Sequence, residues 1–142
     1  LKQGLSMTLT HFSDLLIMAK QQQEPQRLLM VFSSAELPVD ADPEQKEAFA
    51  RGEGGTLAPV LCVDKRPEDI QSFEDLVAES TLTGLNWDIL FVAAMNGRAG
   101  VPPNEDEAVQ PLKMMVEAVK GGRIGQFAAV DRKGALIELT RG

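Results

Sequence analysis

The sequence is poor in the side chains that most enzymes and metal sites use. It contains one cysteine, one histidine and no tyrosine among 142 residues, and aromatic residues make up 5%. Zinc and other transition-metal sites need several His, Cys or carboxylate ligands close together. His11 and Cys62 occur in separate predicted elements. We therefore expect no metal, no cofactor and no catalytic nucleophile with an adjacent base.

His11 and Cys62 both have structural interpretations that we favour. His11 stands at the start of a predicted helix, and we expect a helix-start or surface residue rather than a general base. Cys62 lies in an apolar predicted strand, and free cysteine is among the most buried residue types. We therefore expect an inert core thiol, since a reactive one would need a basic, partly exposed setting.

Basic charge is also scarce. Lys and Arg number 14 against 21 Asp and Glu, which gives a net charge of −7. Nucleic-acid phosphates and anionic membrane surfaces attract basic proteins, so we expect neither as a partner. No run approaches the roughly 18 apolar residues of a membrane-spanning helix, and the first residues lack a signal-peptide pattern. A single cysteine allows no intramolecular disulfide, which fits a reducing compartment. We expect a cytoplasmic protein with a leader at residues 1–9 and one α–β domain at residues 10–142.

Hydrophobic periodicity and turn residues predict alternating helices and strands. Thr10 can cap the first helix, Asp42 precedes a proline at the start of the second, and Ser72 can cap the third. Pro59 inside a strand indicates an edge position or a bulge. The predicted helices cover residues 10–23, 43–51, 72–84 and 104–122, with the stretch GEGG at 52–55 ending the second; the predicted strands cover residues 27–34, 56–63 and 87–94, with a hairpin at 125–140.

This order predicts an α/β or α+β fold. We expect one layered domain with a mixed sheet of about five strands, helices packed on it, and a C-terminal β-hairpin. The strand at residues 87–94 should be central. Pro111 lies within the last predicted helix, and either the helix begins near it or the helix kinks there. Asn104 with Glu107 has the spacing of a capping box.

The stretch Ala93 to Glu107, AAMNGRAGVPPNEDE, carries the one loop with ligand-binding character. It follows a strand and precedes a helix, where free N–H groups can bind anions. Glycine permits close backbone approach and Arg98 supplies charge. The candidate ligand-binding residues in this loop and at the end of the preceding strand are Asn96, Gly97, Arg98, Gly100, Asp64, Lys65 and Arg66.

A plain structural loop is the competing interpretation, and we favour it. Glu105, Asp106 and Glu107 already place negative charge at the helix start, where it complements the helix dipole and repels an anion. Asn96-Gly97 and Pro102-Pro103 are ordinary turn residues. Gly-x-x-Gly recurs elsewhere in this glycine-containing chain, so the spacing alone is weak evidence.

Four stretches together resemble a family of short bacterial proteins that carry the label "ribonucleotide reductase subunit alpha". These stretches are PQRLLMVFSSAELP, GEGGTLAPVLCVDKRPEDI, WDILFVAAMNGRAG and PLKMMVEAVKGGRIGQFAAVDRKG. The resemblance covers nearly the whole chain after Met7. It implies no catalytic residues, because no activity is established for the group. Separately, the pattern around APVLCVDKRPEDIQSFEDL is loosely similar to SseB-type domains, which is an analogy of fold alone.

The family label can be tested on chemistry. A reductase large chain resembles a barrel of several hundred residues, with one cysteine that carries a radical and two that reduce the ribose. A chain of 142 residues with one cysteine cannot perform that reaction alone. We expect instead a non-enzymatic interaction domain, a homodimer by preference because two-fold dimers are the commonest oligomers. The alternatives are a small enzyme or binder of anionic ligands at the strand-end loops and, more remotely, an accessory protein of the reductase.

Overall fold

Strand β1 (Gln26–Glu36) runs through the sheet with β2 (Thr56–Lys65) on one side and β3 (Ile89–Asn96) on the other. In this computed structural model, residues 9–37, 40–51 and 55–139 are described. The expected leader lies almost wholly outside them, as do residues 52–54 of the predicted helix stop. Residues 26–33 are buried without interruption because helices cover both faces of the sheet there. That burial explains the continuous apolar run in the sequence.

The remaining strands are β2 (Thr56–Lys65), β3 (Ile89–Asn96), β4 (Ala128–Val130) and β5 (Leu136–Ile137). The order across the sheet is β2-β1-β3-β4-β5, so β3 is central as predicted. The predicted single sheet of five strands with a C-terminal hairpin is confirmed. The expected mixed pairing is wrong, because all four strand pairs are antiparallel. The connection through α3 joins β2 and β3, which run parallel to each other with β1 between them, so no helical connection joins two parallel neighbours.

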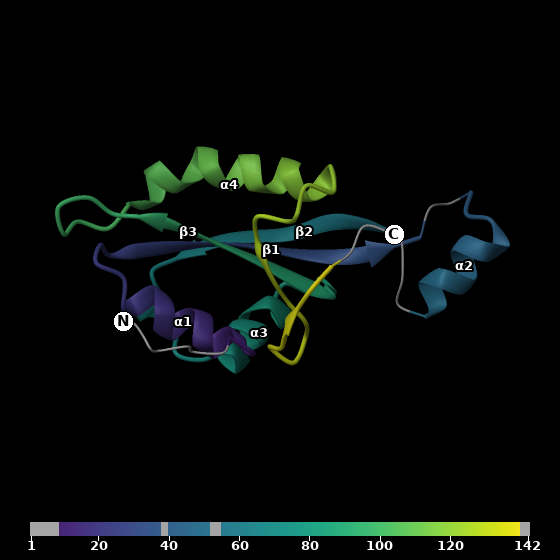
Figure 1. The fold of residues 1–142 in the computed structure, drawn as a ribbon, viewed down its shortest axis with the longest axis horizontal. Coiled ribbons are helices and arrows are strands. Elements are labelled where there is room, and N and C mark those ends of the chain that lie inside the picture. The colour runs from purple at the N-terminus through teal and green to yellow at the C-terminus, as the bar shows by residue number, and fades with distance from the viewer. Residues whose placement is uncertain (1–8, 38–39, 52–54, 140–142) are drawn as a thin grey trace.

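Two layers of helices sandwich the sheet (Figure 1). Helices α1 (Phe12–Lys20) and α3 (Phe73–Thr81) cover one face together with the short 3₁₀ helix η1 (Pro67–Asp69). Helix α4 (Glu105–Lys120) covers the other face. Alternate residues of β1 divide between the two cores: Met30 and Phe32 pack towards α1 and α3, and Leu29 and Val31 pack towards α4. No helix in the described ranges has the length and hydropathy needed to cross a bilayer.

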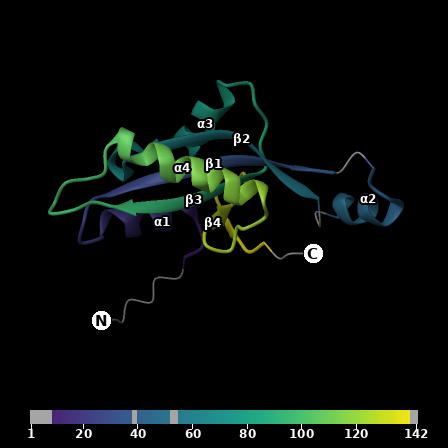
Figure 2. The ribbon, with the colours of Figure 1, turned by 90° about the horizontal axis from the view of Figure 1, so that it is seen from above.

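Helix α2 (Pro43–Ala50) stands apart from these layers. It lies between the end of β1 and the start of β2, and it projects beyond the end of the sheet (Figures 1 and 2). None of its residues is buried. Asp42 caps it through a capping box with Gln45, and Pro43 opens it, as the sequence predicts. We call the segment described at residues 37, 40–51 and 55, with α2 at its centre, the arm.

Two local expectations need correction or resolution. His11, not Thr10, caps α1: the His11 ring accepts from the Ser13 N–H, and Asp14 accepts from the His11 N–H. Helix α4 begins at Glu105 with the predicted Asn104–Glu107 capping box, so Pro111 lies inside the helix and not in its first turn. The absent N–H of Pro111 removes one backbone hydrogen bond from the helix interior.

Candidate functional site

The two predicted site segments lie at the same end of the sheet. β2 and β3 are both antiparallel to β1, and Leu28 of β1 faces Lys65 on one side and Ala94 on the other. Asp64, Lys65 and Arg66 therefore reach the same sheet end as Asn96 and its loop, with β1 between them. To this extent the structure brings the predicted residues together.

Their side chains do not converge on one pocket. Asp64 pairs in register with Leu29, on the α4 face, and its carboxylate lies 2.6 Å from Arg27 Nε. Lys65 points to the opposite face, where its Nζ lies 3.0 Å from Glu79 Oε2 of α3. Arg66 is exposed, with its Nε 3.6 Å from Glu68 Oε1. The two cations of this predicted group thus have carboxylate partners within the protein.

The Gly97–Gly100 loop is a tight turn whose backbone N–H groups donate hydrogen bonds within the protein. Arg98 and Val101 exchange two backbone hydrogen bonds of 2.9 Å, and Ala99 and Gly100 both have positive φ. The Gly97 N–H donates to the Pro25 carbonyl at 2.8 Å. The Gly100 N–H donates to a Glu24 carboxylate oxygen at 2.8 Å. The N–H groups of Gly97, Arg98, Gly100 and Val101, which could contact an anion, are therefore already bonded within the chain.

The N-terminus of α4 is also satisfied internally. The Asn104 side chain accepts from the Glu107 N–H at 2.8 Å, and Glu107 accepts from the Asn104 N–H at 3.0 Å. Glu105 and Asp106 add further negative charge in the first turn. An incoming anion would meet these carboxylates first, so the helix dipole is complemented without a ligand.

Arg27 is the residue at this sheet end that sequence reasoning missed. It is only 7% exposed, and besides Asp64 it donates from Nη1 to the Pro103 carbonyl at 3.3 Å. Its Nη2 lies 3.9 Å from Glu105 Oε1. One signal could have found it: a charged residue that opens a buried apolar strand requires a partner, because an unpaired buried charge is very costly.

His11 serves the structural role that the sequence predicts. Its Nδ1 accepts from the Ser13 N–H at 3.0 Å, and its Nε2 lies 3.2 Å from the Lys133 carbonyl oxygen. Asp14 completes this cap. Hydrogen bonds from the backbone N–H groups of Thr10 and then His11 lower the pKa of the Asp14 carboxyl below its ordinary value.

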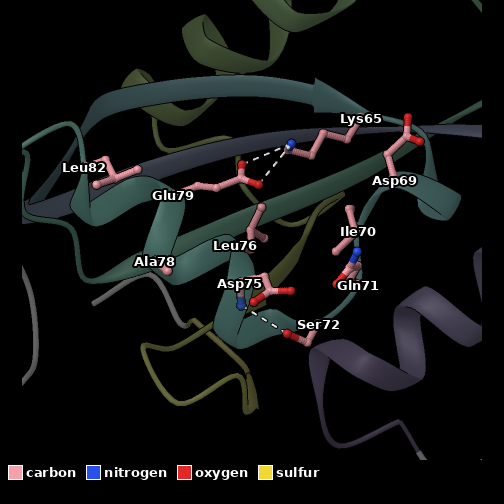
Figure 3. Close-up of a pocket in the computed structure, with 10 residues that line it drawn as sticks. All are labelled: Lys65, Asp69, Ile70, Gln71, Ser72, Asp75, Leu76, Ala78, Glu79 and Leu82. Carbon is pink, nitrogen blue, oxygen red and sulfur yellow. Dashed lines mark hydrogen bonds and ion pairs between the residues drawn. The ribbon is translucent and has the colours of Figure 1, made fainter.

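A groove opens between the end of β2, η1 and α3, and sequence reasoning did not find it (Figure 3). Its cavity volume is about 430 Å³. The buried side chains of Ile70 and Leu76 contribute apolar surface. Around them stand three carboxylates against one ammonium group, that of Lys65. The lining comprises Lys65, Asp69, Ile70, Gln71, Ser72, Asp75, Leu76, Ala78, Glu79 and Leu82. This excess of negative charge opposes an anionic ligand.

The outer edge of β2 borders this groove and is the more extensive feature. β2 is one of the two edge strands of the sheet, and it has ten residues where β5 has two. Residues 56–63 include no charged side chain. Pro59 predicted an edge position or a bulge, and the structure has both. β2 lies at the edge of the sheet, and its register with β1 shifts between Phe32 and Ser33. Beyond the bulge, residues 61–65 present a regular edge.

Cys62 corrects a sequence-based expectation. It was expected in the core, but it is exposed. Cys62 pairs with Val31 of β1, whose side chain is fully buried under α4. Helix α4 contacts β2 as well as β1, yet it leaves the side chain of Cys62 exposed on this face. A strand pattern predicts which residues share a face but not how far the covering helix extends.

Within the described residues, no three His, Cys, Asp or Glu side chains come together as a metal site would require. Comparison with protein-family models, with curated proteins and with solved structures finds no match for this chain. The functional argument therefore depends on the geometry of the edge strand, the groove and the charged residues around them.

Proposed function

We propose that this chain is a non-enzymatic interaction domain that binds an extended polypeptide segment along the open edge of β2. The observation that carries the proposal is the contrast between the two edges of the sheet. β5 is two residues long, whereas β2 presents ten. Natural proteins protect long edges with charges, coverings or bulges, and residues 56–63 carry only the bulge and Pro59.

Strand addition supplies both affinity and selectivity. Backbone N–H and C=O groups of the incoming segment would bond to those on the outer side of β2, which is the general mode of β-augmentation. Side chains of that segment would alternate between the exposed margin at Cys62 and the groove beside Lys65. The groove's carboxylates favour a neutral or cationic side chain there.

We place this activity in the cytoplasm. Cys62 is the one cysteine of the chain and it is exposed. A reducing compartment keeps such a thiol free, whereas an oxidising one would drive it into bonds with other molecules.

Photo-crosslinking tests the proposal. A photoreactive amino acid in place of Cys62 should form a covalent adduct with a polypeptide in living cells. The same amino acid in place of Lys133, in the turn of the C-terminal hairpin, is the matched control because Lys133 is also exposed but lies away from β2. Adducts from position 62 well above those from position 133 support the proposal. Equal or absent adducts at position 62 overturn it.

A binder of small anionic ligands at the strand-end loops is the second candidate. The observation in its favour is the shared sheet end of Asp64–Arg66 and Asn96–Gly100. The ion pairs of Lys65 and Arg66 and the occupied N–H groups of the Gly97–Gly100 turn count against it. An Arg98 variant, described in the Discussion, distinguishes the two candidates.

A further inference from the structure

The segment that completes β2 is, we infer, β2 of a second copy of this chain. This inference rests on the proposed function and names the partner at the same site. The two copies form a two-fold dimer in which antiparallel β2 strands join five strands from each copy into one continuous sheet.

The edge of β2 is suited to pairing with itself. A two-fold interface brings the same patch of both copies together, and two antiparallel copies of one strand satisfy that requirement. Like charges directly opposite each other destabilise such a pair. Residues 56–63 have no charge, so most of the strand can lie beside its own copy without repulsion. The charges of β2, Asp64 and Lys65, stand at its C-terminal end and already have partners.

The ends of the strand are complementary in charge. Antiparallel pairing sets the C-terminal end of one β2, with Lys65 and the exposed Arg66, beside the N-terminal end of the other. The arm leads into that N-terminal end (Figure 1). The arm carries Asp40, Asp42, Glu44 and Glu47 against Lys46 and Arg51, so its net charge is negative and a cationic strand end meets an acidic arm. Symmetry makes this contact twice in each dimer.

The arm gives a second, independent argument. Helix α2 has eight residues and none is buried. Isolated helices shorter than about 12 residues are marginal in water, and helices in proteins gain most of their stability from packing. Capping by Asp42 and Gln45 contributes on the order of 1 kcal/mol. Only Ala48 and Phe49 of this helix are half-buried, and a second copy seated against the arm would add packing surface for the exposed residues.

Cys62 is a natural reporter for this dimer because the chain has no other cysteine. With a spin label on Cys62 of each copy, the distance between the two labels should be about 10–20 Å, as expected for positions near the middle of paired strands. The control carries the label on Lys133→Cys in a Cys62→Ser background. These labels, on opposite outer parts of the joined sheet, should lie about 35 Å or more apart. Light scattering should give twice the chain mass of 15.4 kDa.

Substitutions at Cys62 and Arg66 test the contacts themselves. Cys62→Lys places a lysine on each of the two edges, which natural proteins use against edge pairing, and should give a monomer, while Cys62→Ser should remain dimeric. Circular dichroism should show both folded, since the side chain at position 62 is exposed. Arg66→Glu should weaken dimerisation about fivefold or more, and adding Glu47→Lys should restore it.

The outcomes separate the dimer from the proposed function. A monomer at about 100 µM overturns the dimer, and so does a dimer with distant labels at position 62. If position 62 then crosslinks to a different polypeptide in cells, strand addition to β2 survives with another partner. If position 62 gives no adduct at all, both proposals fall.

Discussion

Arg27 Nε and Asp64 Oδ2 lie 2.6 Å apart, and this pair joins β1 to β2 beneath the start of α4. The Asp64 side chain is 23% exposed and that of Arg27 is 9% exposed, so the pair is mostly shielded from water. Arg27 extends the connection to the Pro103 carbonyl. Arg27 therefore ties the loop before α4, the sequence-predicted candidate for anion binding, to the sheet. The charge of Arg27 is already matched by Asp64 and is not free for a ligand.

Replacing Asp64 by Ala should lower the free energy of unfolding by about 2–3 kcal/mol, because Arg27 would keep a buried charge without its carboxylate. Glu79→Ala is the matched control. It removes the partner of Lys65 in a more exposed pair and should cost under about 1 kcal/mol. Urea denaturation of both variants measures the difference. Equal decreases in the free energy of unfolding would show that the Arg27–Asp64 pair stabilises the protein no more than the exposed Lys65–Glu79 pair.

Gly97→Ala should destabilise the protein by about 2 kcal/mol or more. A Cβ atom there would lie 2.2 Å from the Val101 carbonyl oxygen and 2.7 Å from the Pro25 carbonyl oxygen, and both are backbone atoms. Gly125→Ala, where a Cβ meets nothing within 4 Å, should change the stability by less than about 0.5 kcal/mol. Thermal melts of the two variants compare these positions. Similar melting temperatures would contradict the close approach at Gly97.

The cap of α1 should weaken in acid. Since the folded-state pKa of Asp14 is lowered, its contribution is present above the ordinary carboxyl value and is lost as pH falls through the folded value. Wild type should therefore exceed Asp14→Ala in stability by a constant amount above about pH 5, and the gap should close below about pH 4. Denaturation midpoints of the wild type and of Asp14→Ala, measured from pH 7 to pH 2.5, give this difference in stability. A gap that stays constant to pH 2.5 would refute the role of the ionised carboxylate.

Arg98 should be dispensable for stability. Its backbone makes the turn with Val101, but its side chain is exposed, so Arg98→Ala should shift the melting temperature by no more than about 2 °C. We also expect no saturable binding by the unmutated protein across a calorimetric panel of nucleotides and sugar phosphates. Saturable binding that Arg98→Ala abolishes would establish the anion site instead.

The purified chain should form no deoxynucleotides from ribonucleotides. Reduction of the ribose requires a radical-carrying thiol and two further thiols, and the chain has Cys62 alone. Assays with each ribonucleoside diphosphate and triphosphate, with dithiothreitol as reductant, test this expectation. Product formed by the pure protein, and lost in Cys62→Ser, would overturn it.

Local chemistry was predictable because it depends on residues close in sequence. The caps at Asp42, Ser72 and Asn104 lie where their spacing indicated, and the hairpin turn closes through the Gly134 N–H and the Asp131 carbonyl. Pro59 likewise marked both the edge strand and its bulge, because proline lacks the N–H that an interior ladder needs. At α1 the prediction was wrong by one residue, since a histidine ring accepts the N–H bond that threonine was expected to take.

The candidate site was less predictable than the fold. Sequence proximity suggested that Asp64, Lys65 and Arg66 act together, yet alternation along a strand sends Asp64 and Lys65 to opposite faces of the sheet. The groove combines Lys65 with α3, and its shape depends on how that helix packs. No pattern in the sequence specifies such packing in advance.

By itself, therefore, the sequence determined the elements, their caps and turns, the acidic balance of charge and the scarcity of cysteine and histidine. Tertiary structure decided the antiparallel strand order, the partner of Arg27 and the exposure of Cys62 at an open edge. The physical reason is the range of the interactions involved. Capping bonds and hydrophobic periodicity act over a few residues, whereas the pairing of β1 with β2 and β3 and the reach of α4 over the sheet join residues far apart in the chain.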